Sequence, residues 1–125
     1  TKFGLVTPYV EDLQRQIVAK YSDAGFECVG EAHLGRDDGY NFAQIEDDTW
    51  SSLIRQVAAS GPQAITTMCT NISGAPLAEP MERETGIPLI DSISASLWAA
   101  MKLAGANPAR ITGWGKMFAG FSAVA

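Results

Sequence analysis

The chain has 125 residues, of which 46% are hydrophobic and 18% charged, and its formal net charge is −5. This composition is typical of one globular domain and argues against a disordered segment or two full domains. The acidic balance, with no run of Lys or Arg, argues against partners such as nucleic acid or an anionic membrane surface, and no apolar stretch approaches the roughly 18 residues that a membrane span requires.

The cysteine count and the first residues bear on the cellular compartment. Cys28 and Cys69 are too few for a disulfide framework. The first ten residues lack the basic region and long apolar region of a signal peptide. Both features predict a reduced, cytoplasmic protein. The chain opens on Thr1 and enters a strand-like run at once, which leaves open whether it is a piece of something longer.

The first half of the chain is predicted to form two strands and two helices. Residues 2–7 have the pattern of a short buried strand, and apolar residues then recur at helical spacing over 10–21. A second strand is predicted at 26–29, followed by a polar, glycine-rich loop over 30–41. The next helix is expected to start with Asp47 or Asp48 as its cap and to end before Gly61-Pro62.

The second half of the chain continues the alternation of predicted strands and helices. A third strand is predicted at 64–69, a polar turn at 70–76 and a short helix at 77–84. A fourth strand follows at 88–91. A last helix is expected to be capped by Ser92, Ser94 or Ser96 and to end near Gly105. Residues 107–125 form a weakly patterned tail.

Four strand–helix alternations predict the fold class. Repeated βαβ units indicate a doubly wound α/β domain, in which a four-stranded parallel sheet carries helices on both faces. We expect residues 1–125 to form this single domain. Ligands bind such sheets beyond the carboxyl ends of the strands, near a point where the strand order reverses.

Cys69 is the sharpest candidate at that edge. It ends a predicted strand and precedes a turn, so backbone N–H groups there can stabilise a thiolate, and the same groups can hold a carboxylate or an oxyanion. The alternative is that Cys69 is a small buried hydrophobic residue, as free cysteine often is. For Cys28, in mid-strand, we favour that second interpretation.

The other candidates are less specific. Tyr9 can reach over the sheet edge or be an ordinary half-buried tyrosine. Asn41 is favoured as a loop residue, and His33, the only histidine, as an exposed loop side chain. The acidic pairs at 37–38 and 47–48 lack metal-site spacing, and Gly113 and Gly115 do not form a dinucleotide fingerprint. The sequence thus predicts no metal and no cofactor.

Five stretches together are similar, in order and spacing, to the C-terminal half of the maleate cis–trans isomerases. Close relatives are the arylmalonate decarboxylases and the ectoine-utilisation isomerase-like proteins, all in the aspartate/glutamate racemase superfamily. The stretches are VTPYVED at 6–12, MCTN at 68–71, GIPLIDS at 86–92, LWAA at 97–100 and GWGKMF at 113–118.

The resemblance implies a flavodoxin-like half of a two-domain enzyme, with substrate held between the halves. The first-half cysteine of maleate isomerases attacks the alkene to give a succinyl-thioether, the C–C bond rotates, and elimination gives fumarate. By motif, Cys69 is the second-half cysteine that donates and accepts the proton. Thr70 and Asn71 would bind a substrate carboxylate, and Tyr9 and Asn41 would contact substrate.

The resemblance also implies a partner. The first half, with its nucleophilic cysteine, is absent from this chain, so we expect it to associate with that half or with another copy as a homo-oligomer through an exposed apolar face. The run Cys-Thr-Asn stands where arylmalonate decarboxylases have Cys-Gly-Gly, which favours a cofactor-independent isomerase. The alternatives are a decarboxylase or racemase, in which Cys69 protonates an enolate, and a non-catalytic dicarboxylate-binding domain.

Overall fold

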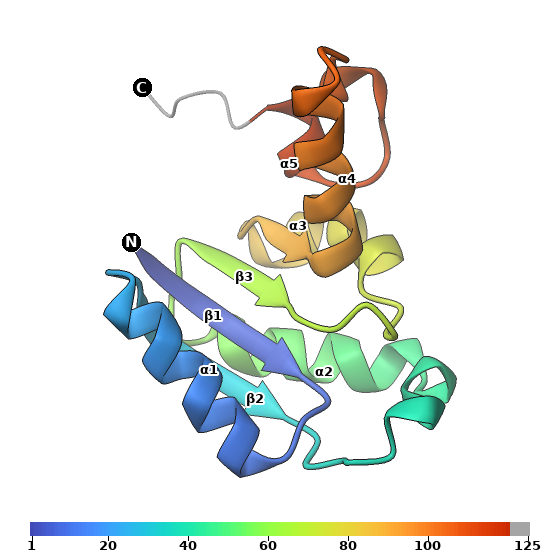
Figure 1. The fold of residues 1–125 in the computed structure, drawn as a ribbon. Helices are drawn as coiled ribbons and strands as arrows, with labels where there is room; N and C mark the ends of the chain where they lie inside the picture. Colours follow the sequence, from blue (N-terminus) through green and yellow to red (C-terminus); the bar gives the residue numbers. More distant parts are fainter. Residues whose placement is uncertain (121–125) are drawn as a thin grey trace.

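Four parallel strands form the centre of the molecule (Figure 1). The computed structural model describes residues 1–120. The strands lie in the order β2-β1-β3-β4. Their bounds are Lys2–Thr7 for β1, Glu27–His33 for β2, Ala64–Thr67 for β3 and Leu89–Asp91 for β4.

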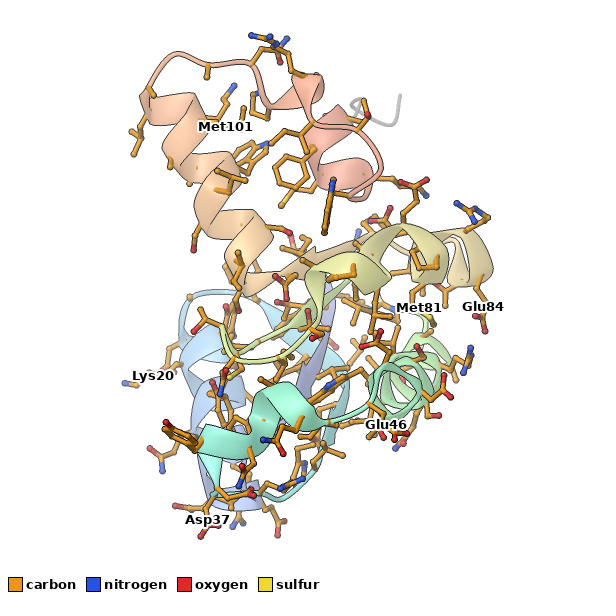
Figure 2. The ribbon with its side chains drawn as sticks, turned by 90° about the vertical axis from the view of Figure 1, so that its right-hand side faces the viewer. Lys20, Asp37, Glu46, Met81, Glu84 and Met101 are labelled. Carbon is orange, nitrogen blue, oxygen red and sulfur yellow. The ribbon has the colours of Figure 1, made fainter. Side chains whose placement is uncertain are left out.

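Helices cover both faces of this sheet, which confirms the predicted doubly wound α/β fold. Helix α1 (Glu11–Asp23) lies on one face, and α2 (Asp47–Ala58) and α3 (Ala78–Thr85) lie on the other. Helix α4 (Ser92–Leu103) extends away from the end of β4 and packs with the short helix α5 (Lys116–Ala119). Figure 2 shows Met101, on α4, far from the layer that carries Met81 of α3.

The alternation of side chains along the strands assigns each residue to a face. Val6, Ile65 and Leu89 join Trp50 and Ile54 of α2 in the main hydrophobic cluster. Trp50 is fully buried in that cluster. The larger part of the hydrophobic core therefore lies between the sheet and the layer of α2 and α3.

The opposite face has a smaller apolar contact with α1. The Phe3 ring of β1 packs on the Tyr21 ring of α1, with centroids 4.9 Å apart. Beyond α1, Thr66, Met68 and Ile90 from the β3–β4 side of the sheet are only half-buried. This face is therefore covered by α1 at β1 and β2 but remains accessible at β3 and β4.

Several predicted boundaries were wrong. β2 continues to His33 instead of ending at 29, because residues 30–33 pair with β1 as far as Thr7. The sequence did not predict this part of the strand, because polar side chains alternate along it. His33 is thus a half-buried strand residue bonded to Glu31, not a loop residue. β3 ends at Thr67, two residues before its predicted end at Cys69.

The predicted helix caps also differ from the structure. Asp47 and Asp48 lie inside the first turn of α2, whose N-cap is Glu46 without a side-chain cap bond. Helix α4 is capped by Asp91, whose carboxylate accepts from the Ile93 and Ser94 N–H groups.

Much of the predicted tail is regular. It contains a 3₁₀ turn, Pro108–Arg110, and the helix α5. Residues 121–125 lie outside the described residues. No helix within residues 1–120 is long and apolar enough to cross a membrane.

Candidate functional site

The strand order reverses between β1 and β3, and Tyr9 and Cys69 follow these two strands. β1 leads to β2 on one side, whereas β3 lies on the other side of β1. Both side chains pack against the main hydrophobic cluster. Burial, together with its interaction with the Cys69 thiol, raises the pKa of Tyr9 to about 12. Tyr9 therefore keeps its proton at neutral pH and can act as a hydrogen-bond donor.

The Cys69 backbone has an unusual conformation. Its φ of 150° makes it the one non-glycine residue with positive φ among residues 1–120. Its N–H donates to Ser92 Oγ at 3.2 Å, and its Sγ accepts the Asn71 N–H at 3.4 Å. Positive φ at a non-glycine residue costs roughly 1–3 kcal/mol and persists only where neighbouring contacts impose it, as they often do at functional sites.

A chain of buried and part-buried hydrogen bonds fixes the segment that carries Tyr9. The Tyr9 N–H donates to Thr7 Oγ1 at 3.2 Å, and that hydroxyl donates to Gln14 Oε1 at 2.6 Å. Gln14 Nε2 donates in turn to Glu31 Oε2 at 2.8 Å. Thr7 and Gln14 are almost completely buried. The end of β1 is therefore held to α1 and β2 by a fully paired polar network.

A 3₁₀ segment that the sequence did not predict, Gly39–Gln44, contacts Tyr9 and Asn71. The Phe42 ring meets the Tyr9 ring edge-on, with centroids 6.2 Å apart, and is buried. Asn71 Nδ2 donates to the Gly39 carbonyl at 2.6 Å. The loop after β2 is thus fastened to the loops after β1 and β3.

The remaining predicted contacts are placed differently. Asn41 is exposed and donates through Nδ2 to Asp38 Oδ2 at 3.4 Å. Thr70 is also exposed, at the turn that follows Cys69. The structure therefore brings Asn71 to Cys69 through a hydrogen bond and leaves the side chains of Asn41, Thr70 and Asn71 exposed at this edge.

A buried carboxyl group lies behind the Cys69 turn. Asp91 is 1% exposed, accepts the Thr67 hydroxyl at 3.1 Å, and its pKa is raised by burial. Gly74 packs directly against it, since a Cβ at Gly74 would lie 2.6 Å from Thr67 Oγ1 and would collide with the Asp91 carboxylate. This contact closes the back of the turn.

Sequence reasoning missed two residues of this site, Gln14 and Phe42, and the contact of a third, Ser92. All three contact Tyr9, Cys69 or their backbones directly or through one residue. Ser92 was expected at the sheet edge, at the end of the fourth strand, and as a possible helix cap, but its bond to Cys69 was not predicted. Gln14 gave a weak signal, as a polar residue at an inward position of an amphipathic helix.

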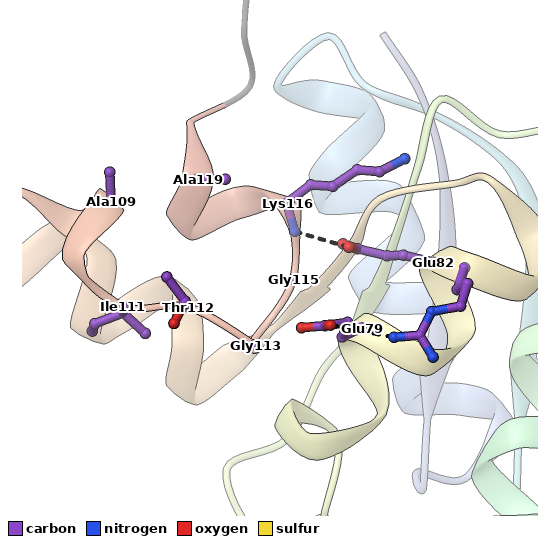
Figure 3. A pocket seen from close by; sticks show the side chains of 10 residues that line it. Glu79, Glu82, Ala109, Ile111, Thr112, Gly113, Gly115, Lys116 and Ala119 are labelled. Atoms are coloured by element: carbon purple, nitrogen blue, oxygen red, sulfur yellow. Dashed lines mark hydrogen bonds and ion pairs between the residues drawn. The ribbon is translucent and has the colours of Figure 1, made fainter.

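A separate hollow of about 430 Å³ lies between α3 and the C-terminal segment (Figure 3). Cys69 and Tyr9 do not line it. The buried Glu82 carboxylate beside it accepts the Leu89 N–H at 2.9 Å and the Lys116 N–H at 2.8 Å. These two bonds fasten the start of α5 to α3 and β4, which gives Glu82 a structural role.

The titratable residues of the described part do not form a metal site. Within residues 1–120, no group of three or more His, Cys, Asp or Glu side chains is arranged to hold a metal ion. Both cysteines are free thiols. Cys28 is half-buried in β2 and donates to the Gly30 carbonyl at 3.4 Å, away from this sheet edge.

The sheet order and these contacts define an α/β protein with a thiol and a phenol at the switch point of a parallel sheet. The chain belongs to the arylmalonate decarboxylase family, whose model matches residues 1–118.

Comparison with individual proteins supports the predicted resemblance to both enzymes. The chain is 24% identical over 119 residues to the arylmalonate decarboxylase of Bordetella bronchiseptica, covering 94% of this chain and 50% of that protein. It is 27% identical over 124 residues to the maleate isomerase of Nocardia farcinica, covering 98% of this chain and 49% of that protein.

A solved structure shares the fold. It is the Nocardia farcinica maleate cis–trans isomerase in a cysteine-to-serine mutant with a covalently bound succinylcysteine intermediate. The TM-score is 0.89 at 24% identity, and the match covers 94% of this chain and 48% of that one. The chain spans about half the length of the curated relatives it matches.

Proposed function

We propose that this chain supplies the acid–base half of a cofactor-independent enzyme that isomerises a small dicarboxylate, maleate to fumarate or a close analogue. The pairing of Tyr9 with Cys69 at the switch point supports this proposal most directly, since it places a thiol beside a phenol donor. The succinylcysteine intermediate of the Nocardia relative points to thiol chemistry on a four-carbon dicarboxylate in that protein.

The proposed role of Cys69 is proton transfer. A thiolate from the other half adds to one alkene carbon while Cys69 gives its proton to the neighbouring carbon, so the double bond becomes a single bond that rotates. The Cys69 thiolate then removes a proton from that carbon, the C–S bond breaks, and fumarate leaves with the thiolate of the other half and the Cys69 thiol restored. The Asn71 N–H, 3.4 Å from Sγ, and the Tyr9 hydroxyl stabilise the thiolate between these steps.

Substrate carboxylates are proposed to bind at the exposed rim. The Thr70 hydroxyl and the Asn71 side-chain amide lie on the turn after Cys69. Asn71 Nδ2 carries two hydrogens, and one of them is available to a substrate carboxylate after the bond to the Gly39 carbonyl. Tyr9 donates from the opposite loop. Asn41 joins this set by exchanging its bond to Asp38 for one to substrate.

The partner is proposed to be a first half of the same fold or another copy of the chain. The mechanism needs a second cysteine that does not lie at this edge, and the chain spans about half of its relatives. Helix α4 supports this proposal because its sequence is apolar on several sides, while Ile93 and Leu97 are 48% and 46% exposed. An apolar helix of this kind belongs in a protein interior. The free thiols fit a reduced, cytoplasmic setting.

Decarboxylation is the second candidate function, and the family match favours it. In that reaction a malonate-type substrate loses CO₂, and the resulting enolate takes the proton of Cys69 on one face, with no thioether formed. The same rim would hold the remaining carboxylate.

Mass spectrometry of the intact protein separates these functions. Rapid quenching during turnover of maleate is expected to trap a succinyl adduct on a cysteine other than Cys69. Decarboxylation of an arylmalonate without any adduct would favour the second function. Dicarboxylate binding by calorimetry with neither turnover nor adduct would contradict both and support a non-catalytic binding domain.

A further inference from the structure

The backbone of Cys69 is held by one hydroxyl that comes from another element. Ser92, the first residue of α4, accepts the Cys69 N–H at 3.2 Å and donates to the Thr67 carbonyl at 3.3 Å. A single Oγ thus bridges the backbone on both sides of Met68. These bonds connect the residue after β4 to the end of β3. One of them is made by the backbone of Cys69 itself, whose φ is 150°.

The position of Ser92 is itself fixed by buried contacts. The preceding residue, Asp91, pairs with Thr67 in the parallel register and accepts its hydroxyl at 3.1 Å. Asp91 also caps α4 through the Ile93 and Ser94 N–H groups. The helix cap does not require the Ser92 hydroxyl, so the bonds of that hydroxyl to β3 are separate from the formation of the helix.

We propose that Ser92 is a positioning residue for Cys69, which holds the Cys69 backbone at positive φ and thereby directs the thiol toward Tyr9. Without the hydroxyl, the Cys69 N–H loses its acceptor and the residue relaxes toward negative φ, which turns its side chain away from the phenol. The inference rests on the proposed function only in that it takes Cys69 to be the reacting thiol. Small displacements of a reacting group lower the rate of a reaction more than they lower binding.

The test compares variants of the intact protein that differ in this hydroxyl. Ser92→Ala and Ser92→Val remove it, and Ser92→Thr retains it with the shape of valine. Ser96→Ala is the matched control, because Ser96 lies one turn along α4 and its hydroxyl bonds only the Ser92 carbonyl, at 2.9 Å. The readouts are iodoacetamide alkylation of the Cys69 peptide, hydrogen exchange of the Cys69 amide, and the split of maleate turnover into kcat and KM.

We expect the two variants without the hydroxyl to alkylate Cys69 at a rate changed by roughly fivefold to tenfold, which corresponds to one lost hydrogen bond. The Cys69 amide should exchange faster by a similar factor, and kcat should fall while KM stays within about twofold. Ser92→Thr and Ser96→Ala should behave as the parent protein does.

Parent-like alkylation and exchange in folded Ser92→Ala would overturn the proposal. Equal effects of Ser92→Ala and Ser96→Ala would also overturn it, because the cause would then be the helix in general. Failure of both hydroxyl-free variants to fold, with Ser92→Thr folded, would assign Ser92 a structural role instead. If Cys69→Ala keeps full turnover while Ser92→Ala still changes Cys69 exchange, the proposed function fails and the positioning by Ser92 stands.

Discussion

At the scale of single residues, the state of the site depends on Tyr9 and its neighbours. The phenol interacts with the Cys69 thiol, its ring packs edge-on against Phe42, and its backbone N–H is held by Thr7. Each contact keeps Tyr9 protonated or fixed in place. A protonated phenol beside Cys69 can stabilise a thiolate, or a carboxylate of a bound ligand, by donating one charge-assisted hydrogen bond.

This arrangement predicts a specific pH dependence. Folded Tyr9 holds its proton up to a pKa of about 12, whereas an unfolded tyrosine loses it near about 10. Its contribution to the free energy of unfolding is therefore fully present below about pH 10 and is lost as pH rises toward 12. Denaturant titrations between pH 9 and 11 should show a steeper loss for the parent protein than for Tyr9→Phe. The same pH dependence of the free energy of unfolding in both proteins would contradict the raised pKa of Tyr9.

At the scale of elements, the sequence predicted all four strands and their order of appearance, as well as helices α1 to α4. Those elements have clear apolar periods, such as Trp50, Ile54 and Val57 on one face of α2. Cys69 and Tyr9 were located because chemistry-bearing residues at strand ends meet at one sheet edge. The 3₁₀ segment of Phe42 and the Ser92 bridge were not predicted, because both depend on contacts between residues distant in sequence.

The turn after β3 depends on a glycine for a reason that only the structure shows. Gly74 has ordinary helical angles, with φ −79° and ψ −39°, so alanine suits its backbone and would otherwise stabilise the protein slightly. A Cβ there would instead collide with the Asp91 carboxylate and lie 2.6 Å from Thr67 Oγ1.

We therefore expect Gly74→Ala to lower the free energy of unfolding by about 1–3 kcal/mol, the usual cost of overpacking. Chemical denaturation checks this value. Gly105→Ala is the control, because Gly105 has a φ of +72° with nothing within 4 Å of its Cβ position, so only backbone strain of about 1 kcal/mol should appear. A Gly74→Ala variant as stable as its parent would contradict this prediction, because it would show that the backbone of the turn shifts enough to relieve the collision with Asp91.

At the scale of the whole molecule, the two faces of the sheet have different surroundings. The α2–α3 layer covers one face, whereas the other face is open at β3 and β4, and α4 extends from the end of β4 with exposed apolar side chains. Leu103 is 90% exposed and Trp114 is 46% exposed. These surfaces, together with the half-length match to the relatives, support the proposed association with a further α/β half.

A charge placed on α4 tests this interpretation. Leu97→Asp should leave the fold of the chain intact, since Leu97 is 46% exposed, and should weaken association with a second copy or an added first half by tenfold or more, on the order of the cost of burying an unpaired charge. Sedimentation measures the association. Gln56→Asp on the exposed side of α2 is the control and should associate as the parent does. Equal association of both variants would place the interface elsewhere.

Turnover of maleate by cysteine variants of the intact protein tests the central claim most directly. Cys69→Ala is expected to lower kcat by at least a thousandfold, because the proton donor and acceptor is removed, whereas Cys28→Ala should retain parent-like activity, since Cys28 lies half-buried in β2. Proton NMR of maleate and fumarate measures both rates, with circular dichroism to establish folding. A folded Cys69→Ala protein that converts maleate as fast as the Cys28→Ala protein would contradict the role assigned to Cys69.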